Sequence, residues 1–362
     1  MLESLALHGF RNLKPLEWSI GEGSHLLLGG NGAGKTSLLE ALYVVATTRS
    51  FRTSQLRECL QRGDEGAGRL LFWISASVSG SSRRYVLELS FSDEGLEREV
   101  DGSSASLAKY LQPLPVVVWS SEEAEILAGS PERRRRMIDR GLVNSDVSRL
   151  AVLAQYSRCL LQKRELLRGG QGGIEEWNHL LAKSAAKLVA ERAAYVGLLD
   201  RELVMAVSSS GLDLPDLSLC YRPSPAAALE GAEVIEGELA RVVDEERRRR
   251  RPVLGPHLDR LDILWGTVDV SQVGSAGEKK ALGLLLLRAQ AAVLEGVGKD
   301  AVVLADDVDA ELDIERLTAV WKVLSRCRQL IATSNRSEVA KALGGSFSWT
   351  VNGGSLSPFE TA

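Results

Sequence analysis

LLLGGNGAGKTS, residues 26–37, joins an apolar run to a complete phosphate-binding loop. The pattern is Gly29, four further residues, and then Gly34-Lys35-Thr36. Glycines let backbone N–H groups approach a polyphosphate, lysine reaches its terminal phosphates, and the threonine hydroxyl can bind Mg²⁺. The flanking strand and helix that this mechanism requires are predicted by the apolar run and by SLLEALYVV. We expect a nucleoside triphosphate at Gly29, Gly30, Asn31, Gly32, Ala33, Gly34, Lys35, Thr36 and Ser37, with the catalytic Lys35 exposed.

An acidic pair follows another apolar strand far along the chain. AVVLA, residues 301–305, is typical of a short buried strand, and Asp306-Asp307 come at its carboxyl end. One carboxylate in this position can hold Mg²⁺, and the next can orient an attacking water. The sequence therefore predicts that Asp306 and Thr36 bind the metal and that Asp307 is catalytic.

A third motif, Ser275-Ala276-Gly277-Glu278, precedes a long apolar helix. Ser275 and Glu278 have the spacing of a capping box, so a simple helix start is one explanation. A serine and a glycine at a helix start can also form a second anion site. ABC-type ATPases have S-x-G-E before the acidic pair, and there the signature serine of one subunit touches the γ-phosphate bound by the other. On this second explanation Ser275 and Gly277 are nucleotide-binding residues.

Several segments, in order, resemble the RecF family of bacterial recombination mediators. They are LALHGFRNL at the start, TSLLEALYVVATTRSFRT after the phosphate loop, VVVWSSEEAEILAGSPERRRRMID, LGPHLDRLDI and LADDVDAELD. The chain departs from the family at Trp119 and Ser121, which replace Phe and Pro, and in reading SAGE where SQGQ is expected. The resemblance extends over most of the chain and places Arg11, of the Phe-Arg-Asn motif, at the nucleotide.

This resemblance implies a function. Proteins of the RecF family bind DNA at single-strand gaps, help load the recombinase with RecO and RecR, and support replication restart and SOS induction. The implied ligands are ATP and Mg²⁺, and the implied assembly is an ATP-dependent homodimer on gapped DNA or on duplex next to a single strand.

Two arginine runs and one looser cluster are candidates for DNA contact. The net charge of −4 offers no global attraction to DNA, so any binding must be local. Arg133, Arg134, Arg135 and Arg136 follow Gly-Ser-Pro at a helix start, where cations oppose the helix dipole. Arg49, Arg52 and Arg57 lie beyond the phosphate-loop helix, and Arg247–Arg251 form the second run. A solvated helix face is the alternative explanation for each run.

The periodicity predicts an α/β fold with an inserted lobe. LLFWISASV and RRYVLELSF alternate as strands do, and Asp101-Gly102 marks a hairpin turn, so an antiparallel sheet is expected before residue 118. Helical spacing from about 131 to 207, broken by RGGQGG, predicts an antiparallel helix pair at about 145–207. We expect an ABC-type P-loop ATPase head, lobe I, of mixed sheets and helices from residues 1–118 and 253–362. A mostly helical lobe II spans 119–252.

Composition agrees with a globular cytoplasmic protein. Apolar residues make up 44% and charged residues 25% of the 362 residues, and no apolar run is long enough for a membrane span. The start, MLESLALHGF, lacks the basic residues of a secretory signal. Four cysteines, Cys59, Cys159, Cys220 and Cys327, have no metal-binding spacing, and we expect reduced thiols.

Two classes of function stay open. The protein is either a weak DNA-dependent ATPase or a nucleotide-gated DNA-binding scaffold with negligible hydrolysis. Asp307 stands where ABC ATPases usually have glutamate, and its shorter side chain favours slow hydrolysis, with Asp309 or Glu311 as alternative bases. Another ATPase of the SMC and Rad50 type is a more remote alternative.

Overall fold

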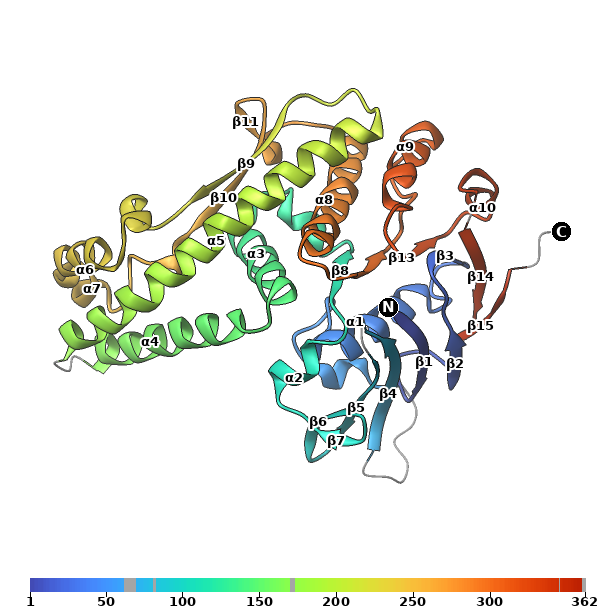
Figure 1. Cartoon of the computed structure of the whole chain (residues 1–362), viewed down its shortest axis with the longest axis horizontal. Coiled ribbons are helices and arrows are strands. Elements are labelled where there is room, and N and C mark those ends of the chain that lie inside the picture. Colours follow the sequence, from blue (N-terminus) through green and yellow to red (C-terminus); the bar gives the residue numbers. More distant parts are fainter. Residues whose placement is uncertain (62–69, 81–82, 170–172, 345, 360–362) are drawn as a thin grey trace. The chain divides into compact units, whose positions relative to one another are not determined.

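The computed structural model describes residues 1–61, 70–80, 83–169, 173–344 and 346–359. The chain divides into two compact units. Unit 1 contains Met1–Leu127, Glu202–Leu214 and Gly274–Ala362, and unit 2 contains Ala128–Arg201 and Pro215–Val273. Figure 1 identifies the helices and strands of both units.

Unit 1 contains an antiparallel sheet in the order β2-β1-β4-β5-β6-β7. Asp101 and Gly102, both with positive φ, form the two-residue turn between β6 and β7. The predicted hairpin and antiparallel sheet are therefore confirmed. The strands are β1 (Leu2–His8), β2 (Leu16–Ser19), β4 (Leu70–Ser79), β5 (Arg84–Ser92), β6 (Gly95–Val100) and β7 (Ser103–Ser104).

A second, mainly parallel sheet has the order β15-β14-β3-β13-β12-β8. Only the β14–β15 pair is antiparallel among its described pairings. Strands β3 and β12 are the two apolar runs recognised in the sequence, and β13 lies between them. The strands are β3 (Gly23–Leu28), β8 (Val116–Trp119), β12 (Val302–Ala305), β13 (Gln329–Ser334), β14 (Ser346–Asn352) and β15 (Ser355–Pro358).

Helix α1 (Lys35–Thr47) lies in the core that both sheets share. Apart from its first turn and Glu40 it is largely apolar, which is the pattern of a buried helix, and its residues from Ser37 to Ala46 are buried. Leu38, Leu42 and Val45 belong to one hydrophobic cluster with residues of both sheets. The helix that begins at the phosphate loop is therefore held in place by packing against both sheets.

Two further helices, α8 (Ala276–Gly296) and α9 (Ile314–Leu324), pack against each other, and α8 packs on β8 and β12. Gly283 of α8 lies against the indole of Trp119, where an added Cβ would come within 2.0 Å of the ring. The shorter elements of this unit are α2 (Leu107–Leu111), α10 (Glu338–Ala342), η1 (Leu56–Cys59) and η2 (Glu123–Ile126).

Unit 2 combines helices with a three-stranded antiparallel sheet of order β11-β10-β9. Its longest helices are α4 (Arg149–Gly169) and α5 (Ile174–Ser210). The last turns of α5, from Glu202 on, belong to unit 1. The two helices run side by side, and Arg149 pairs with Glu191 at 2.9 Å (Figure 1). The other elements are α3 (Pro131–Ser145), α6 (Ala232–Arg241), α7 (Val243–Arg249), β9 (Leu217–Arg222), β10 (Arg260–Trp265), β11 (Val268–Asp269), η3 (Ala226–Glu230), η4 (Pro256–Leu258) and η5 (Val270–Gln272).

The division of the chain differs from the expected lobes in three segments. Residues 119–127 and 202–214 were assigned to the helical lobe, but they belong to unit 1. Residues 253–273 were assigned to the ATPase lobe, but they belong to unit 2. The physical reason is strand pairing, because β10 pairs with β9 from Arg260–Arg222 to Trp265–Leu217. Unit 2 therefore contains a β-sheet as well as helices.

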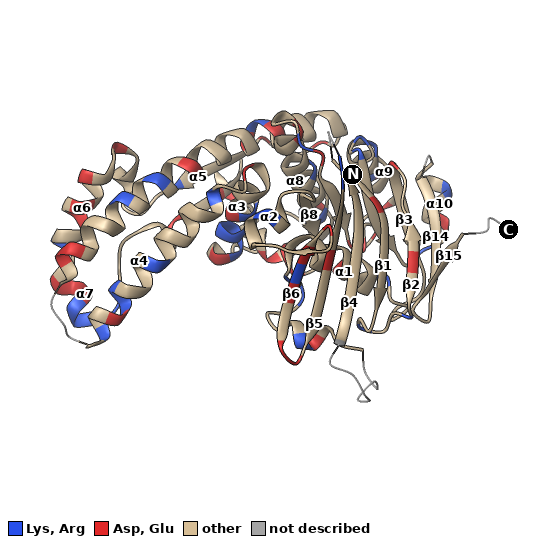
Figure 2. Ribbon diagram, turned by 60° about the horizontal axis from the view of Figure 1, so that its bottom comes forward, with Lys and Arg blue, Asp and Glu red and all other residues tan. Residues whose placement is uncertain are grey.

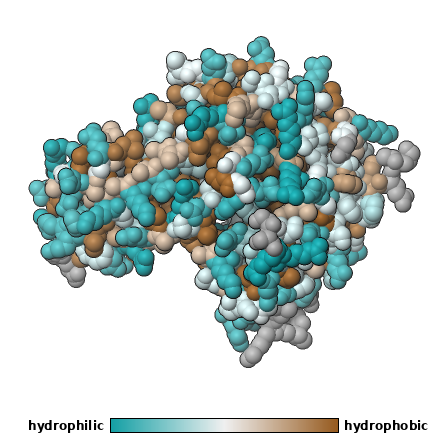
Figure 3. All heavy atoms as spheres, in the orientation of Figure 1, coloured by the Kyte–Doolittle hydropathy of each residue, from teal (hydrophilic) through white to brown (hydrophobic). Residues whose placement is uncertain are grey.

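Within the described part of the chain, none of the helices combines the length and hydrophobicity that a membrane crossing requires. Hydrophilic residues are spread over both units on the face displayed in Figure 3.

Candidate functional site

The phosphate loop connects the end of β3 to the start of α1. Gly29 lies against β14, where an added Cβ would be 2.3 Å from the carbonyl oxygen of Val351. Gly32 and Gly34 have φ of 76° and 115°, a region that favours glycine. The three glycines are therefore required by the path of the backbone, independently of any ligand. A pocket of about 190 Å³ is lined by Asn12, Asn31, Gly32, Ala33, Gly34, Lys35, Thr36, Ser37, Arg52, Asp307 and Asn335.

The Lys35 side chain is buried, so the expectation that it is exposed is wrong. Only 5% of the residue is accessible. Its Nζ donates to the carbonyl oxygens of Gly29 and Gly30 at 2.8 and 3.0 Å and to Oδ1 of Asn335 at 2.6 Å. The ammonium thus lies within the loop, held by three oxygens.

Thr36 and Asp306 meet although they are 270 residues apart in the chain. The Thr36 hydroxyl lies 3.1 and 3.0 Å from the two carboxylate oxygens of Asp306. Thr333 of β13 donates to the same carboxylate at 2.7 Å. Asp306 is buried, and its position is fixed from two strands and one helix.

Asp307 lines the same pocket with a left-handed backbone, φ 48°. Its N–H donates to the Thr333 hydroxyl at 2.7 Å. Burial and the neighbouring Asp306 carboxylate raise the pKa of Asp307, while Lys35 and Lys280 act in the opposite direction. A carboxylate with a raised pKa beside a polyphosphate loop has the properties of a general base.

The alternative bases occupy different environments. Asp309 is buried and pairs with Arg336 at 2.7 Å. Glu311 is exposed, has φ 67°, and does not line the pocket. Of these three carboxylates, that of Asp307 lines the pocket.

Two asparagines of the site were not predicted. Asn12 donates to the carbonyl oxygen of Gly32 at 2.9 Å and accepts from the Ser37 hydroxyl at 2.8 Å. It thereby joins the loop to the first turn of α1. Asn335, which accepts from Lys35, directly follows β13. A polar residue at the carboxyl end of a parallel strand was the available signal for Asn335.

Arg11 does not line the pocket; it pairs with Glu40 of α1 instead. Its guanidinium donates to the two carboxylate oxygens of Glu40 at 2.9 and 2.7 Å. Ser50 donates to the fully buried Glu40, and Arg52 lies 3.3 Å from it. Burial would raise the pKa of Glu40, but the hydrogen bonds from Arg11 and Ser50 lower it overall. Arg11 thus has a structural partner in Glu40, and its nucleotide contact stays a prediction.

Arg52 lies at the phosphate-loop pocket, which was not predicted from the sequence. It was a candidate for DNA contact, yet it both lines the phosphate-loop pocket and pairs with Glu40. Glu40 consequently links the segment after α1 to the pocket.

Ser275 and Gly277 lie at the start of α8, apart from the pocket of the same chain. Gly277 is buried, and an added Cβ there would be 2.7 Å from the carbonyl oxygen of Glu311. The glycine therefore permits close approach of the loop that follows Asp307. A nucleotide contact by Ser275 requires a second copy of the chain and stays a prediction.

Arg134 is a structural residue, and its prediction as a DNA contact is wrong. Only 4% of it is accessible, and its guanidinium donates to Asp269 at 2.7 and 3.0 Å and to the Leu261 carbonyl at 2.8 Å. Arg135 donates to the Asp259 carbonyl oxygen, and Arg136 pairs with Glu132. Partly buried Arg133 follows the cap formed by Ser130. Arg134 and Arg135 thus join α3 to other segments of unit 2, whereas DNA contact by Arg133 and Arg136 stays a prediction.

The remaining arginines differ in exposure. Arg57 pairs with Asp93 at 3.8 Å, and Arg49 is exposed, with no ion pair to any described residue. In the second run, Arg247 and Arg249 pair with glutamates. Figure 2 shows acidic and basic residues mixed along both units, with basic residues gathered near α7.

The donors around Asp306 fit a hard divalent cation. Hydroxyl and carboxylate oxygens are the ligands that Mg²⁺ prefers, and it usually takes one or two of them plus phosphates and water. The described residues include no group of three or more His, Cys, Asp or Glu suited to a metal. Thr36 and Asp306 suit Mg²⁺ because it does not need such a group.

Comparison with known proteins gives one consistent result. Residues 1–351 match the family described as the RecF/RecN/SMC N terminal domain. The DNA replication and repair protein RecF of Geobacter sulfurreducens is 30% identical over 376 residues, covering 99% of both chains. RecF of Myxococcus xanthus is 31% identical, with 98% of this chain and 96% of the relative covered.

Solved structures agree. The recombination mediator protein RecF-ATP of the RecFOR pathway matches with TM-score 0.86 and 25% identity, covering 99% of this chain and 97% of that one. An Smc head bound to the C-winged helix domain of ScpA matches with TM-score 0.56 and 15% identity over 98% and 95% of the chains. The second likeness shows the fold alone.

We predict that Lys35→Ala weakens ATP binding by roughly 10- to 100-fold, because a charge-assisted contact of about 1.5–3 kcal/mol is lost. The melting temperature should also fall slightly, since three acceptors lose their donor. Calorimetric titration with ATP and thermal unfolding check both effects. Lys341→Ala, at an exposed lysine of α10, is the matched control. Unchanged ATP affinity in Lys35→Ala would show that the nucleotide binds elsewhere.

Proposed function

The chain belongs to the RecF family, and we propose that it is an ATP-dependent DNA-binding protein of recombinational repair. In this proposal an ATP-driven dimer binds DNA at gaps, where duplex adjoins a single strand. It helps load the recombinase with RecO and RecR and supports replication restart and SOS induction. The observation that carries the proposal is the convergence of Lys35, Thr36, Asp306 and Asp307 at one edge of the parallel sheet.

The phosphate loop supports binding of ATP. Backbone N–H groups at the start of α1 and the Lys35 ammonium are the donors for the β- and γ-phosphates. To reach them, Lys35 exchanges its contacts with Gly29, Gly30 and Asn335 for phosphate oxygens. Thr36 and Asp306 would hold Mg²⁺, which neutralises phosphate charge when bound.

Asp307 is the proposed general base of a slow hydrolysis. It accepts a proton from the attacking water, and the Thr333 hydroxyl fixes its backbone. The pKa of Asp307 is raised toward neutrality, and this makes its carboxylate a better proton acceptor. An aspartate reaches less far than a glutamate, and this favours slow hydrolysis; the second candidate function is a nucleotide-gated scaffold with negligible hydrolysis.

The dimer is proposed from the separation of two motifs in one chain. Ser275 is exposed at the start of α8 and does not line the pocket that contains the phosphate loop. A second copy could place its own Ser275 at this chain's nucleotide, so that ATP is shared between the copies. ATP then favours the dimer by its differential affinity for the two states.

DNA contact is proposed at Arg49, whose side chain makes no hydrogen bond or ion pair with any described residue. Arg134 belongs to the packing of unit 2, whereas Arg49 is exposed directly after α1. A dimer presents this arginine twice, so ATP should raise DNA affinity by assembly.

We predict that Asp307→Asn slows hydrolysis by roughly two to four decades, the range for losing a general base, while ATP affinity is retained. In the wild type, hydrolysis should decline as the pH falls through the raised pKa of Asp307, because the protonated acid accepts no proton. The variant should lack this pH dependence. Phosphate release between pH 4 and 8 provides the test, with Glu311→Gln as control. Normal turnover in Asp307→Asn would exclude this base.

Ser275→Arg is expected to bind ATP as a monomer but to form no ATP-dependent dimer, since the bulky side chain fills the proposed interface. Light scattering after size-exclusion chromatography, with ADP and with a nonhydrolysable ATP analogue, measures the effect. Ser337→Arg, at an exposed serine before α10, is the matched control. A Ser275→Arg dimer as stable as the wild type would refute the shared site.

For DNA, Arg49→Gln should lower the affinity for gapped duplex in the presence of ATP. The slope of log affinity against log salt should fall by about 0.9 for each phosphate contact removed. Fluorescence anisotropy at several salt concentrations gives both values, and Arg241→Gln, in unit 2, is the control for loss of charge. If both quantities are unchanged in Arg49→Gln, DNA binds through other residues.

A further inference from the structure

At the start of α8, Ser275 of the signature motif and Glu278 are joined by three hydrogen bonds. The Ser275 hydroxyl donates to Oε2 of Glu278 at 2.8 Å and accepts from the Glu278 N–H at 3.3 Å. The Ser275 N–H donates to the same carboxylate oxygen at 2.7 Å. This is a complete capping box, and it uses the only proton that the hydroxyl can donate.

A phosphate oxygen accepts hydrogen bonds and cannot donate one. For Ser275 to bind the γ-phosphate of a partner's ATP, its hydroxyl must therefore release Glu278. Glutamine in place of Glu278, which the family resemblance leads one to expect, could form the same capping box without a negative charge.

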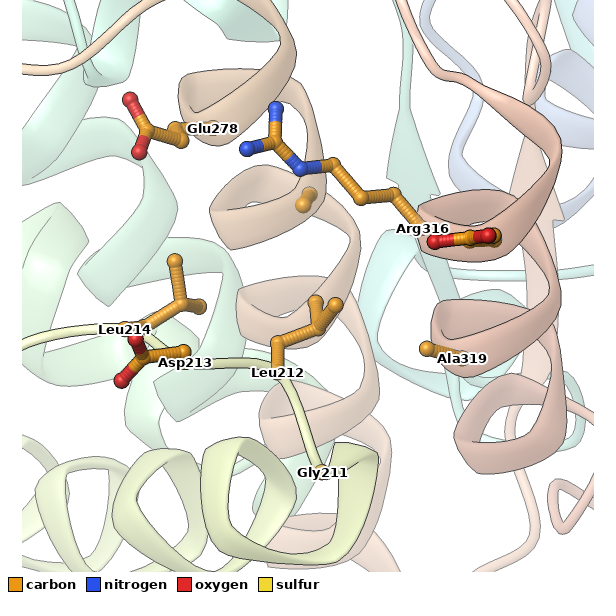
Figure 4. A pocket seen from close by; sticks show the side chains of 9 residues that line it. Gly211, Leu212, Asp213, Leu214, Glu278, Arg316 and Ala319 are labelled. Carbon is orange, nitrogen blue, oxygen red and sulfur yellow. The ribbon is translucent and has the colours of Figure 1, made fainter.

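The Glu278 carboxylate is held in its charged form. Hydrogen bonds from the backbone N–H and hydroxyl of Ser275, together with the guanidinium of Arg316, lower the pKa of Glu278. The side chain lines a pocket of about 350 Å³ between α8, α9 and residues 211–214, all within unit 1. Figure 4 shows Arg316 of α9 pointing toward Glu278 across this pocket.

Arg316 is anchored close to the signature motif. Its Nη1 lies 3.4 Å from the position of a Cβ on Gly277, and its guanidinium is 3.8 Å from Asp313, the residue that caps the start of α9. It therefore offsets part of the Glu278 charge without removing it.

We propose that Glu278 is a positioning residue that restrains ATP-driven dimerisation. It retains the Ser275 hydroxyl and places a negative charge beside the site that the partner's γ-phosphate must reach. Arg316 moderates this restraint. The proposal rests on the shared nucleotide site proposed above and adds a restraint on the assembly of that site.

The size of the effect follows from Coulomb's law. Two like charges about 4 Å apart in a water-like medium weaken binding roughly fivefold, and more so in a drier interface. A twofold dimer contains two such sites, so removing the charge should strengthen the dimer by at least about 25-fold.

The test is Glu278→Gln, which keeps the capping box and removes the charge. Sedimentation velocity gives the dimer dissociation constant with a nonhydrolysable ATP analogue and with ADP. We expect it to fall at least about 25-fold with the ATP analogue and to stay unchanged with ADP, which has no γ-phosphate. Thermal unfolding separates this from a general effect on α8. Glu315→Gln, in the same pocket and with the same change of charge, is the matched control.

Arg316→Gln should act in the opposite direction and weaken the ATP-dependent dimer. In a Glu278→Gln background it should have little further effect, because Arg316 acts through Glu278. An unchanged or weaker dimer in Glu278→Gln, or an equal gain in Glu315→Gln, would overturn the proposal. If Ser275→Arg blocks dimerisation while Glu278→Gln equals the wild type, the shared site stands and this inference alone fails. If no variant distinguishes the ATP analogue from ADP, both fail.

Discussion

The parallel register of β3, β13 and β12 is the constraint that creates the candidate site. Leu28 of β3 pairs with Ser334 of β13, and Ala305 of β12 pairs with Ala332. Because parallel strands end at the same edge of the sheet, their following residues are brought together there. The phosphate loop, Asp306 and Asn335 follow these three strands. The hydrogen bonds between Thr36 and Asp306 depend on this register, since a shift of one residue along β12 would turn the carboxylate to the other face.

The charges of the site are balanced within unit 1. Lys35 is held by neutral oxygens, whereas Lys280 donates to the Asp306 carbonyl at 3.2 Å. Burial lowers the pKa of Lys280, and the nearby carboxylates of Asp307 and Asp306 oppose that shift. A phosphate group would enter a site in which the Lys35 ammonium and the Thr36 hydroxyl already have partners. Ligand binding would then exchange hydrogen-bond partners at Lys35 and, in the proposed dimer, at Ser275.

The sequence allowed the main elements of this site to be predicted because their signals are local. The phosphate loop, the strand before Asp306 and the Asp101-Gly102 turn each depend on adjacent residues. The burial of Lys35 could not be predicted, because its acceptor Asn335 lies 300 residues away. The same holds for Arg134, whose partner Asp269 reaches it only through the fold of unit 2. The pairing of β10 with β9 likewise joins distant segments, and it moved residues 253–273 to the second unit.

The central claim is that one copy of the chain holds only part of the ATP site, and the dependence of ATP affinity on protein concentration tests it most directly. Titration calorimetry with a nonhydrolysable ATP analogue and Mg²⁺ should be repeated at several protein concentrations. Because the nucleotide would be shared, its apparent affinity should rise with protein concentration. The affinity for ADP should stay constant. Equal affinities for the ATP analogue at all protein concentrations would contradict the account, since they would mean that each chain binds its nucleotide alone.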